Sequence, residues 1–290
     1  MSIALAILFL LVAALIFLAL RDNPARVALG AEKTVDTEEG VVQYFLSANT
    51  PARHGERVVL LASYARSVSD FNELVEVLNR QGYQTLAMQM RGVGESTLQP
   101  IASSLFDYAE DLAAVLDAEG WQEPVVIVGH AYGNRVARSF SSRYPERVKS
   151  LILLAAGDSP PPDETRDDIS KVVFQLRPDS TRYEALRRAF FAPENMPPEY
   201  WLSGWYPMAG MVQAYATANT PLESWTAAGN APMLVVQPEH DAAASHGASA
   251  LKARHPDRVT VIPLAGAGHA VLPEKPERVA QIILGHLSAR

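Results

Sequence analysis

The chain has 290 residues, of which 48% are hydrophobic and 20% are charged, and its formal net charge is −7. This length suits one α/β domain with an insertion and is too short for two large domains. The acidic balance argues against a nucleic-acid partner, which needs a concentrated basic face, and the lack of cysteine excludes disulfides and thiol nucleophiles. No group of histidine, aspartate and glutamate residues has the spacing of metal ligands. The sequence therefore predicts neither a metal nor another cofactor.

The chain begins with a long apolar stretch. Residues 2–20 contain no charge and would extend about 28 Å as a helix, which matches the thickness of a bilayer core. A cleavable signal peptide is the alternative, but no basic residue precedes the stretch, and cleavage after Ala19 would place bulky Phe17 where a small residue is preferred. The pattern therefore favours a retained single-pass anchor.

This interpretation divides the chain into three parts, with a membrane as one partner. Basic residues follow the apolar stretch and none precedes it, so the positive-inside rule favours a cytoplasmic globular domain. The predicted parts are a transmembrane anchor over residues 1–21, a linker over 22–40 and a globular domain over 41–290.

Beyond the linker, short apolar runs alternate with segments of helical spacing. Such alternation implies a mostly parallel central sheet with helices on both faces and with chemistry at the carboxyl ends of the strands. The predicted strands cover residues 41–46, 58–63, 85–90, 125–128, 151–154, 233–237 and 259–262. The predicted helices cover residues 68–81, 104–119, 134–144, 244–255 and 276–287.

The alternation stops between about residues 157 and 229, where prolines and aromatic residues cluster. This segment is predicted to be a helical lid. Its aromatic side chains have two interpretations, since they could pack against one another within the lid or line an apolar pocket for an acyl or aromatic ligand.

The turn after the strand at 125–128 has the sequence Gly129-His130-Ala131-Tyr132-Gly133. Two glycines flanking one residue allow a sharp bend between a strand and a helix, which holds the middle side chain at the edge of the sheet. Serine hydrolases carry their nucleophile at that position in a G-x-S-x-G elbow. Here the side chain of Ala131 is a methyl group, which can neither attack a carbonyl nor be activated by a base.

Two further motifs follow in order, Gln237-Pro238-Glu239-His240-Asp241 directly after a strand and Gly266-Ala267-Gly268-His269 near the end. With these motifs the chain resembles the α/β-hydrolase fold family over most of residues 41–290. In that family the triad runs serine, acid, histidine along the chain, so the resemblance implies that Asp241 and His269 are the acid and the base, and that Ala131 occupies a vacant nucleophile position. The amino-acid sequence of the elbow also resembles that of a branch of the family in which alanine is native.

A carboxylate that accepts a hydrogen bond from one imidazole nitrogen fixes the tautomer and leaves the other nitrogen free to take a proton. Asp241 and His269 would form such a general base. Taken singly, Asp241 could instead be a helix N-cap and His269 a surface histidine. His130, beside the elbow, is expected to be a packing residue, and Glu239 is a reserve carboxylate.

Three residues are candidates for binding a ligand or an anionic oxygen. The amide of Tyr132 lies at a helix N-terminus and can stabilise negative charge. Ser63 and Tyr64 follow a predicted strand and bring hydroxyl groups where enzymes of the family usually have a His-Gly pair. Ser63 is also an alternative nucleophile, although nothing in its loop forces its oxygen toward His269.

Ala131 has three explanations: a laboratory substitution of a catalytic serine, a natural loss that leaves a binding protein, or a natural variant in which His269 activates water. The sequence therefore leaves two functions open. The first is a membrane-anchored protein without a serine nucleophile, which binds a small apolar ligand, supports a membrane-protein partner, or has weak histidine-assisted hydrolysis. The second is an active hydrolase of esters, lactones or related acyl compounds.

Overall fold

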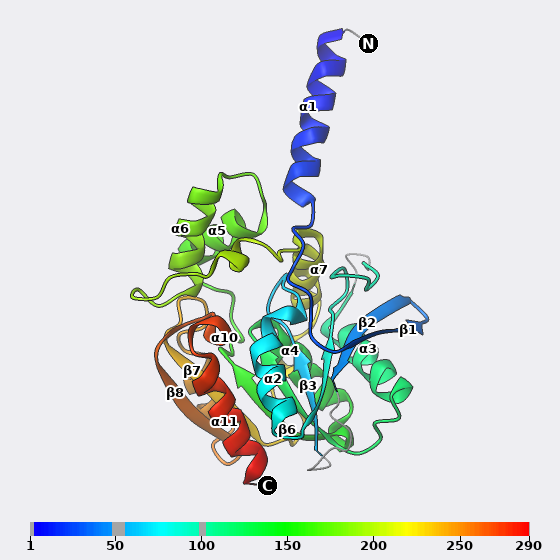
Figure 1. The fold of residues 1–290 in the computed structure, drawn as a ribbon, viewed down its shortest axis with the longest axis vertical. Helices are drawn as coiled ribbons and strands as arrows, with labels where there is room; N and C mark the ends of the chain where they lie inside the picture. Colours follow the sequence, from blue (N-terminus) through cyan, green and yellow to red (C-terminus); the bar gives the residue numbers. More distant parts are fainter. Residues whose placement is uncertain (1–2, 48–55, 99–102, 290) are drawn as a thin grey trace.

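An eight-stranded sheet forms the centre of the computed structural model, which describes residues 3–47, 56–98 and 103–289 (Figure 1). Its strand order is β1-β2-β4-β3-β5-β6-β7-β8. Strand β2 pairs antiparallel with β1 and with β4, and the other neighbouring strands pair parallel. The strands are β1 (Ala31–Thr37), β2 (Gly40–Ser47), β3 (Arg57–Leu61), β4 (Gln84–Met88), β5 (Val125–His130), β6 (Val148–Leu154), β7 (Met233–His240) and β8 (Val259–Gly268).

The strands from β2 onward confirm those predicted from the apolar runs. Strand β1 is additional and lies within residues 22–40, so the predicted linker is wrong over this stretch, which belongs to the sheet. Its sequence AEKTVDT leaves most side chains exposed at the edge of the sheet. An exposed edge strand lacks the apolar pattern by which a strand is recognised.

Helices cover both faces of the sheet. Successive side chains of a strand point to opposite faces, so Val58 and Leu60 of β3 pack toward α2 and α11, whereas Val59 and Leu61 pack toward α3 and α4. The helices outside the lid are α1 (Ile3–Leu20), α2 (Asn72–Arg80), α3 (Leu105–Ala118), α4 (Tyr132–Arg143), α9 (Gly247–Arg254), α10 (Val271–Glu274) and α11 (Pro276–Ser288).

Two predicted helices begin later than expected. The segment predicted over 68–81 is divided into a 3-10 turn, η1 (Val68–Phe71), and α2. The Ser67 hydroxyl caps η1 by accepting from the Ser69 amide at 3.2 Å. The segment predicted over 244–255 becomes helical only at Gly247.

The predicted lid, residues 157–229, contains α5 (Asp163–Val173), α6 (Asp179–Phe190), η3 (Glu199–Leu202), α7 (Pro207–Ala218) and α8 (Leu222–Trp225). Helices α5 and α6 lie beyond the carboxyl ends of β7 and β8 (Figure 1). Aromatic side chains hold this part together, because the rings of Phe190, Phe191 and Trp205 each lie within 6.0 Å of Trp201. The packing interpretation therefore accounts for most of these aromatic residues.

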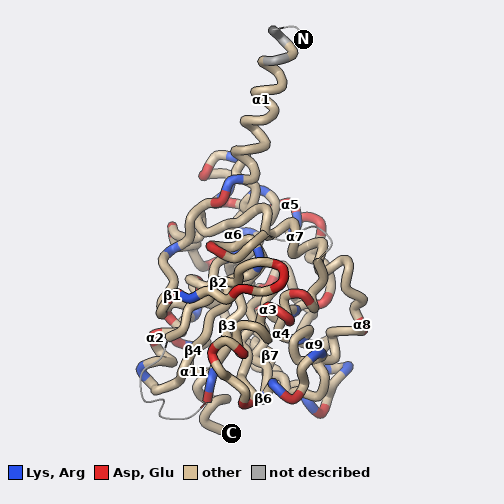
Figure 2. Tube along the Cα trace, turned by 90° about the vertical axis from the view of Figure 1, so that its right-hand side faces the viewer, with Lys and Arg blue, Asp and Glu red and all other residues tan. Residues whose placement is uncertain are grey.

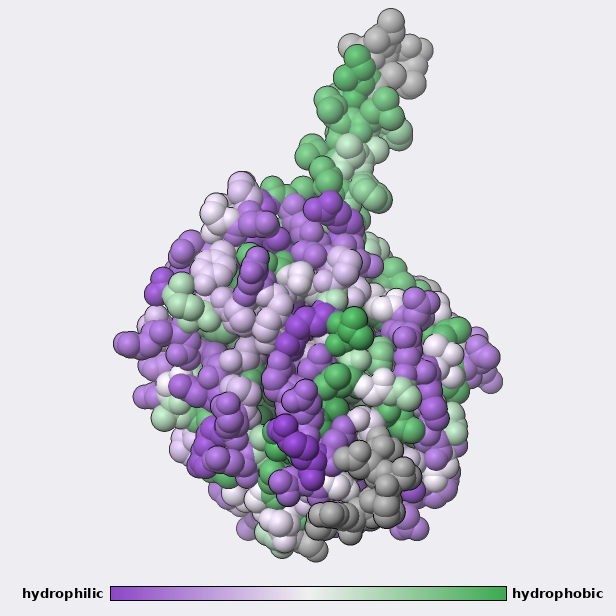
Figure 3. Space-filling model, viewed as in Figure 1, coloured by the Kyte–Doolittle hydropathy of each residue, from purple (hydrophilic) through white to green (hydrophobic). Residues whose placement is uncertain are grey.

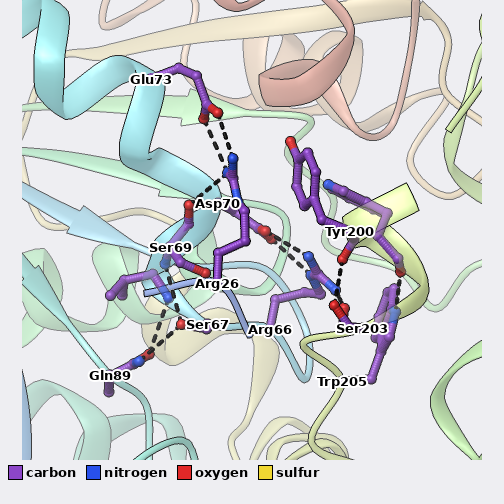
Figure 4. A network of polar contacts seen from close by, with 12 residues as sticks. Arg26, Arg66, Ser67, Ser69, Asp70, Glu73, Gln89, Tyr200, Ser203 and Trp205 are labelled. Carbon is purple, nitrogen blue, oxygen red and sulfur yellow. Dashed lines mark hydrogen bonds and ion pairs between the residues drawn. The ribbon is translucent and has the colours of Figure 1, made fainter. Parts of the chain in front are cut away.

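A buried arginine links the lid to the loop after β3. The guanidinium of Arg66 donates to both carboxylate oxygens of Asp70 at 2.6 and 2.8 Å and to the carbonyl oxygen of Ser203 at 2.5 Å (Figure 4). It also lies 4.6 Å from the ring centroids of Trp201 and Trp205. These contacts fix the loop that carries two of the predicted site residues.

The segment that follows α1 is bonded to the same region of the lid. The Asn23 amide donates to the carbonyl of Trp205 at 3.1 Å, and the Gly204 amide donates to the carbonyl of Asn23 at 2.7 Å. Further along, Arg26 pairs with Glu73 at 2.6 Å and stacks over the ring of Tyr200 (Figure 4). The N-terminal segment thus connects the lid to helix α2.

Helix α1 projects from the body and carries no charge, whereas both signs of charge are spread over the rest of the chain (Figures 1 and 2). Its surface is apolar (Figure 3). In the part of the chain that the structure describes, no helix combines the length and apolarity needed to cross a membrane.

The predicted single-pass anchor over 1–21, and the membrane localisation derived from it, are therefore wrong by this test. Residues 1 and 2 of that prediction lie outside the described residues.

Candidate active site

The predicted site residues follow the carboxyl ends of neighbouring parallel strands. Ala131 comes directly after β5, Asp241 after β7, and His269 after β8, while Ser63 and Tyr64 follow β3. The register of the last two strands pairs His240 with Gly268, which places Asp241 beside His269 although 28 residues separate them in the chain. The topology of the sheet thus brings these residues to one edge.

The turn after β5 bends in the way expected of an elbow. Ala131 has φ of +48° and ψ of −107°, a left-handed conformation that costs a non-glycine residue about 1–3 kcal/mol. A Cβ atom on Gly133 would lie 2.1 Å from the carbonyl oxygen of Leu61, and one on Gly129 would lie 2.6 Å from the carbonyl carbon of Gly133. Both glycines are needed because the backbone of helix α4 lies in direct contact with the backbones of β3 and β5.

Asp241 and His269 form a buried hydrogen-bonded pair, with His269 Nδ1 2.9 Å from Asp241 Oδ1. The same oxygen accepts from the amides of Ala243 at 3.0 Å and Ala244 at 2.8 Å, so Asp241 also caps the following turn. Burial by itself would raise the pKa of Asp241, but the charge and hydrogen bond of His269 and the two amide donors outweigh it and lower this pKa. The aspartate therefore remains ionised beside the imidazole.

His130 lies behind this pair rather than in the cavity. It is fully buried, and its Nε2 is 2.8 Å from the carbonyl oxygen of His269. Burial, with a smaller contribution from His269, lowers the pKa of His130 to about 4. The imidazole is neutral at pH 7 and supports the backbone that carries His269, which is the packing role expected from the sequence.

Replacing His130 with glutamine should reduce the acid sensitivity of the fold. The unfolded chain protonates His130 as the pH falls below about 6.5, whereas the folded chain does not until about pH 4. Between these values unfolding takes up a proton, so the unmodified chain should lose about 3 kcal/mol that His130→Gln retains. Urea unfolding at pH 7 and at pH 4 measures this, and an equal loss in both proteins would contradict the assignment.

A cavity of about 510 Å³ lies between this edge of the sheet and the lid. Its floor includes the predicted residues Ser63, Tyr64, Ala131, Tyr132 and His269. Most of its wall is apolar and comes from the lid, including Pro160, Pro161, Ile169, Val173, Phe174 and Phe190. The structure therefore gathers five of the six predicted site residues around one space, with Asp241 behind His269.

Groups that stabilise a negatively charged oxygen are available at this floor. Tyr132 is the first residue of α4, so its amide has no acceptor within the helix and lies at the positive end of the helix dipole. Burial raises the pKa of the Tyr64 hydroxyl to about 12, and burial likewise raises that of Tyr132 well above its ordinary value. Both hydroxyls therefore stay protonated and are hydrogen-bond donors rather than bases.

Glu239 does not take part in the pair. Its carboxylate accepts from the Gly266 amide at 2.8 Å and is exposed to solvent. The reserve role given to Glu239 therefore finds no support in this geometry.

The cavity residues that the sequence did not predict include Gln213 on α7 and Arg135 on α4. Gln213 is fully buried, and its Oε1 accepts from the Ala65 amide at 2.8 Å. Because an amide N–H requires an acceptor, this contact fixes the orientation of the side chain and leaves Nε2 as the free end, which has no partner among the described residues. No local motif marks either residue, since both become part of the site only through the tertiary fold.

Comparison with known proteins agrees with the geometry. Residues 56–191 match the family model described as alpha/beta hydrolase fold. The chain is 34% identical over 103 residues to a serine hydrolase-like protein of Danio rerio, covering 35% of this chain and 31% of that protein. It is 30% identical over 140 residues to a cis-3-alkyl-4-alkyloxetan-2-one decarboxylase of Shewanella oneidensis, covering 44% and 43%. The chain thus spans less than half the length of these curated relatives.

Solved structures match over more of the chain. An enol-lactonase from Burkholderia xenovorans has a TM-score of 0.73 at 16% identity, covering 88% of this chain and all of that one. An esterase from Thermogutta terrifontis has a TM-score of 0.72 at 21% identity, covering 90% and 99%. The strand order, the elbow, the matched family model and these neighbours together show that the chain has the alpha/beta hydrolase fold.

Proposed function

We propose that the chain is a hydrolase of small acyl compounds, such as esters or lactones, in which His269 activates water without a serine intermediate. The observation that carries this proposal is the buried Asp241–His269 pair beside a cavity whose elbow position holds a methyl group. A vacant triad that had only lost its nucleophile still contains a base, and a water molecule can occupy the space where a serine hydroxyl would lie.

The chemistry follows from the pair. With Nδ1–H donating to Asp241, the Nε2 atom of His269 accepts a proton from water, and the resulting hydroxide adds to the acyl carbon. The amide of Tyr132 stabilises the negative oxygen of the tetrahedral intermediate. The bond from carbon to the leaving oxygen then breaks, and the proton on Nε2 passes to that oxygen, which releases a carboxylic acid and an alcohol.

The similar proteins support an acyl substrate. One solved neighbour is an enol-lactonase and another is an esterase, and the relative from Shewanella oneidensis is named for an oxetan-2-one, which is itself a cyclic ester. These names favour a hydrolase over a protein that only binds ligands. The apolar lid wall suits the hydrocarbon part of such a compound.

The decisive measurement is ester hydrolysis by the purified chain and by its His269→Ala variant. A general base contributes about 10²- to 10⁴-fold, so we expect slow turnover of a short acyl ester that falls at least about a hundredfold in the variant. His246→Ala, which changes an exposed histidine, is the matched control and should keep the full rate. Equal rates in the chain and in His269→Ala would refute the proposal.

A ligand-binding protein without turnover is the second candidate, and the methyl group of Ala131 favours it, because no covalent intermediate can form there. The same assay separates the two functions. Binding of acyl compounds with no hydrolysis above the buffer rate would establish the second candidate.

A further inference from the structure

Arg135 places a positive charge on the wall of the cavity. It lies one turn into α4 from Ala131, is half-buried, and lines the same space as His269. Within the residues that the structure describes, its guanidinium makes one long hydrogen bond, to the carbonyl oxygen of Ser159 at 3.3 Å. Among the described residues, no carboxylate lies within ion-pairing distance of this guanidinium.

The acidic residue that acts on Arg135 electrostatically, Asp158, already has two other partners. Asp158 is buried, and its two oxygens pair with Arg138 at 2.6 Å and with Arg254 at 2.7 Å. Asp158 acts on Arg135 electrostatically but cannot neutralise three guanidinium groups. Burial lowers the pKa of Arg135, which is the direction expected for a cation without an adequate partner.

The rest of the cavity wall does not compensate for this charge. The residues that line it include two arginines and, within the described part of the chain, no aspartate or glutamate. The other arginine, Arg166, is exposed and pairs with Asp163, so its charge is balanced outside the cavity. A partly buried guanidinium without a carboxylate is costly unless a ligand supplies one.

We propose that the cavity binds an acyl compound that carries a separate carboxylate, and that Arg135 pairs with this carboxylate. The acyl part of the assignment rests on the proposed function. The planar fork of arginine accepts a carboxylate through two parallel hydrogen bonds. A carboxylate fits better than a phosphate monoester, because one unpaired guanidinium can neutralise a single negative charge but not two.

The test compares charged and neutral versions of one compound. Monomethyl succinate, monomethyl glutarate and monomethyl adipate each carry an ester and a carboxylate at different separations, and their dimethyl esters lack the charge. Isothermal titration calorimetry on the full chain should give at least tenfold tighter binding for one monoanion than for its diester. Equal affinity across the whole series would overturn the proposal.

Variants assign the effect to Arg135. Arg135→Met keeps an unbranched apolar stem without the guanidinium charge and should reduce the preference for the monoanion to less than about twofold. The matched control is Arg143→Met on the same helix, where the arginine is exposed, and it should keep the preference. Should Arg135→Met not fold, Arg135→Lys retains a charge but loses the fork, and a reduced preference is again expected. A preference that survives both changes would contradict the assignment.

Two further outcomes separate this proposal from others. Binding of hexyl phosphate ten times more tightly than hexanoate would replace the carboxylate with a phosphate and overturn the proposal as stated. Calorimetry does not depend on turnover, so an Arg135-dependent preference without hydrolysis supports the carboxylate site and refutes the hydrolase. Equal hydrolysis of monoanion and diester, with equal affinity for both, supports the hydrolase and refutes the carboxylate site.

Discussion

Replacing Ala131 with serine should convert the chain into a serine hydrolase of the usual kind. The strained turn already holds the side chain of residue 131 at the cavity floor, and the Asp241–His269 pair is assembled beside the same space. Loss of the serine from a working triad lowers kcat by about 10⁶-fold, and the reverse change should recover at least about a hundredfold. Turnover of a short acyl ester and covalent labelling by a fluorophosphonate both measure this gain.

The labelling must depend on the elbow and on the base. Ala214→Ser adds a hydroxyl elsewhere on the cavity wall and should not label. The double change Ala131→Ser with His269→Ala should also fail to label, because the hydroxyl then has no base. If Ala131→Ser stays unlabelled although it folds, then His269 does not reach the elbow and the proposed catalytic arrangement is wrong.

Replacing Gly133 with alanine should destabilise the whole domain. The new Cβ would lie 2.1 Å from the carbonyl oxygen of Leu61, and neither atom belongs to a flexible side chain. Relief requires helix α4 to move away from strand β3 and disturbs the packing of both layers. We expect a loss of more than about 3 kcal/mol in the free energy of unfolding, measured by urea denaturation.

The control for this change is Gly285→Ala. Gly285 lies on the exposed face of α11, and its added Cβ meets nothing within 4 Å. Because alanine is about 1 kcal/mol better than glycine inside a helix, this variant should be slightly stabilised. A similar loss of stability in both variants would mean that the close contact at Gly133 is not the cause.

Much of the sheet and the core of the site could be predicted from local sequence. Buried strands such as β5 are continuous apolar runs, and a motif at the end of a parallel strand must lie at the carboxyl edge of the sheet. This rule predicts that Asp241 and His269 lie close together. The structure places His269 Nδ1 2.9 Å from Asp241 Oδ1. The elbow could be anticipated because two glycines around one residue specify a close approach of backbones.

The remaining features depend on information that a local pattern does not contain. Arg135 has the spacing of an ordinary polar residue on a helix, and only the burial of Asp158 between two other arginines makes its charge significant. Gln213 becomes a cavity residue through a contact with Ala65 that spans 148 residues. The absence of charge in residues 2–20 predicts an anchor, but no helix among the described residues combines the length and apolarity needed to cross a membrane.

The path of residues 21–26 has a practical consequence for experiments on this protein. A force applied through a tag or a solid support attached before helix α1 reaches the lid first, through the hydrogen bonds of Asn23. It reaches the sheet only afterwards. Helix α11 ends at the opposite extremity of the molecule (Figure 1). Immobilisation through the C-terminus therefore leaves the roof of the cavity unloaded, and rates of ligand entry are better recorded in that orientation.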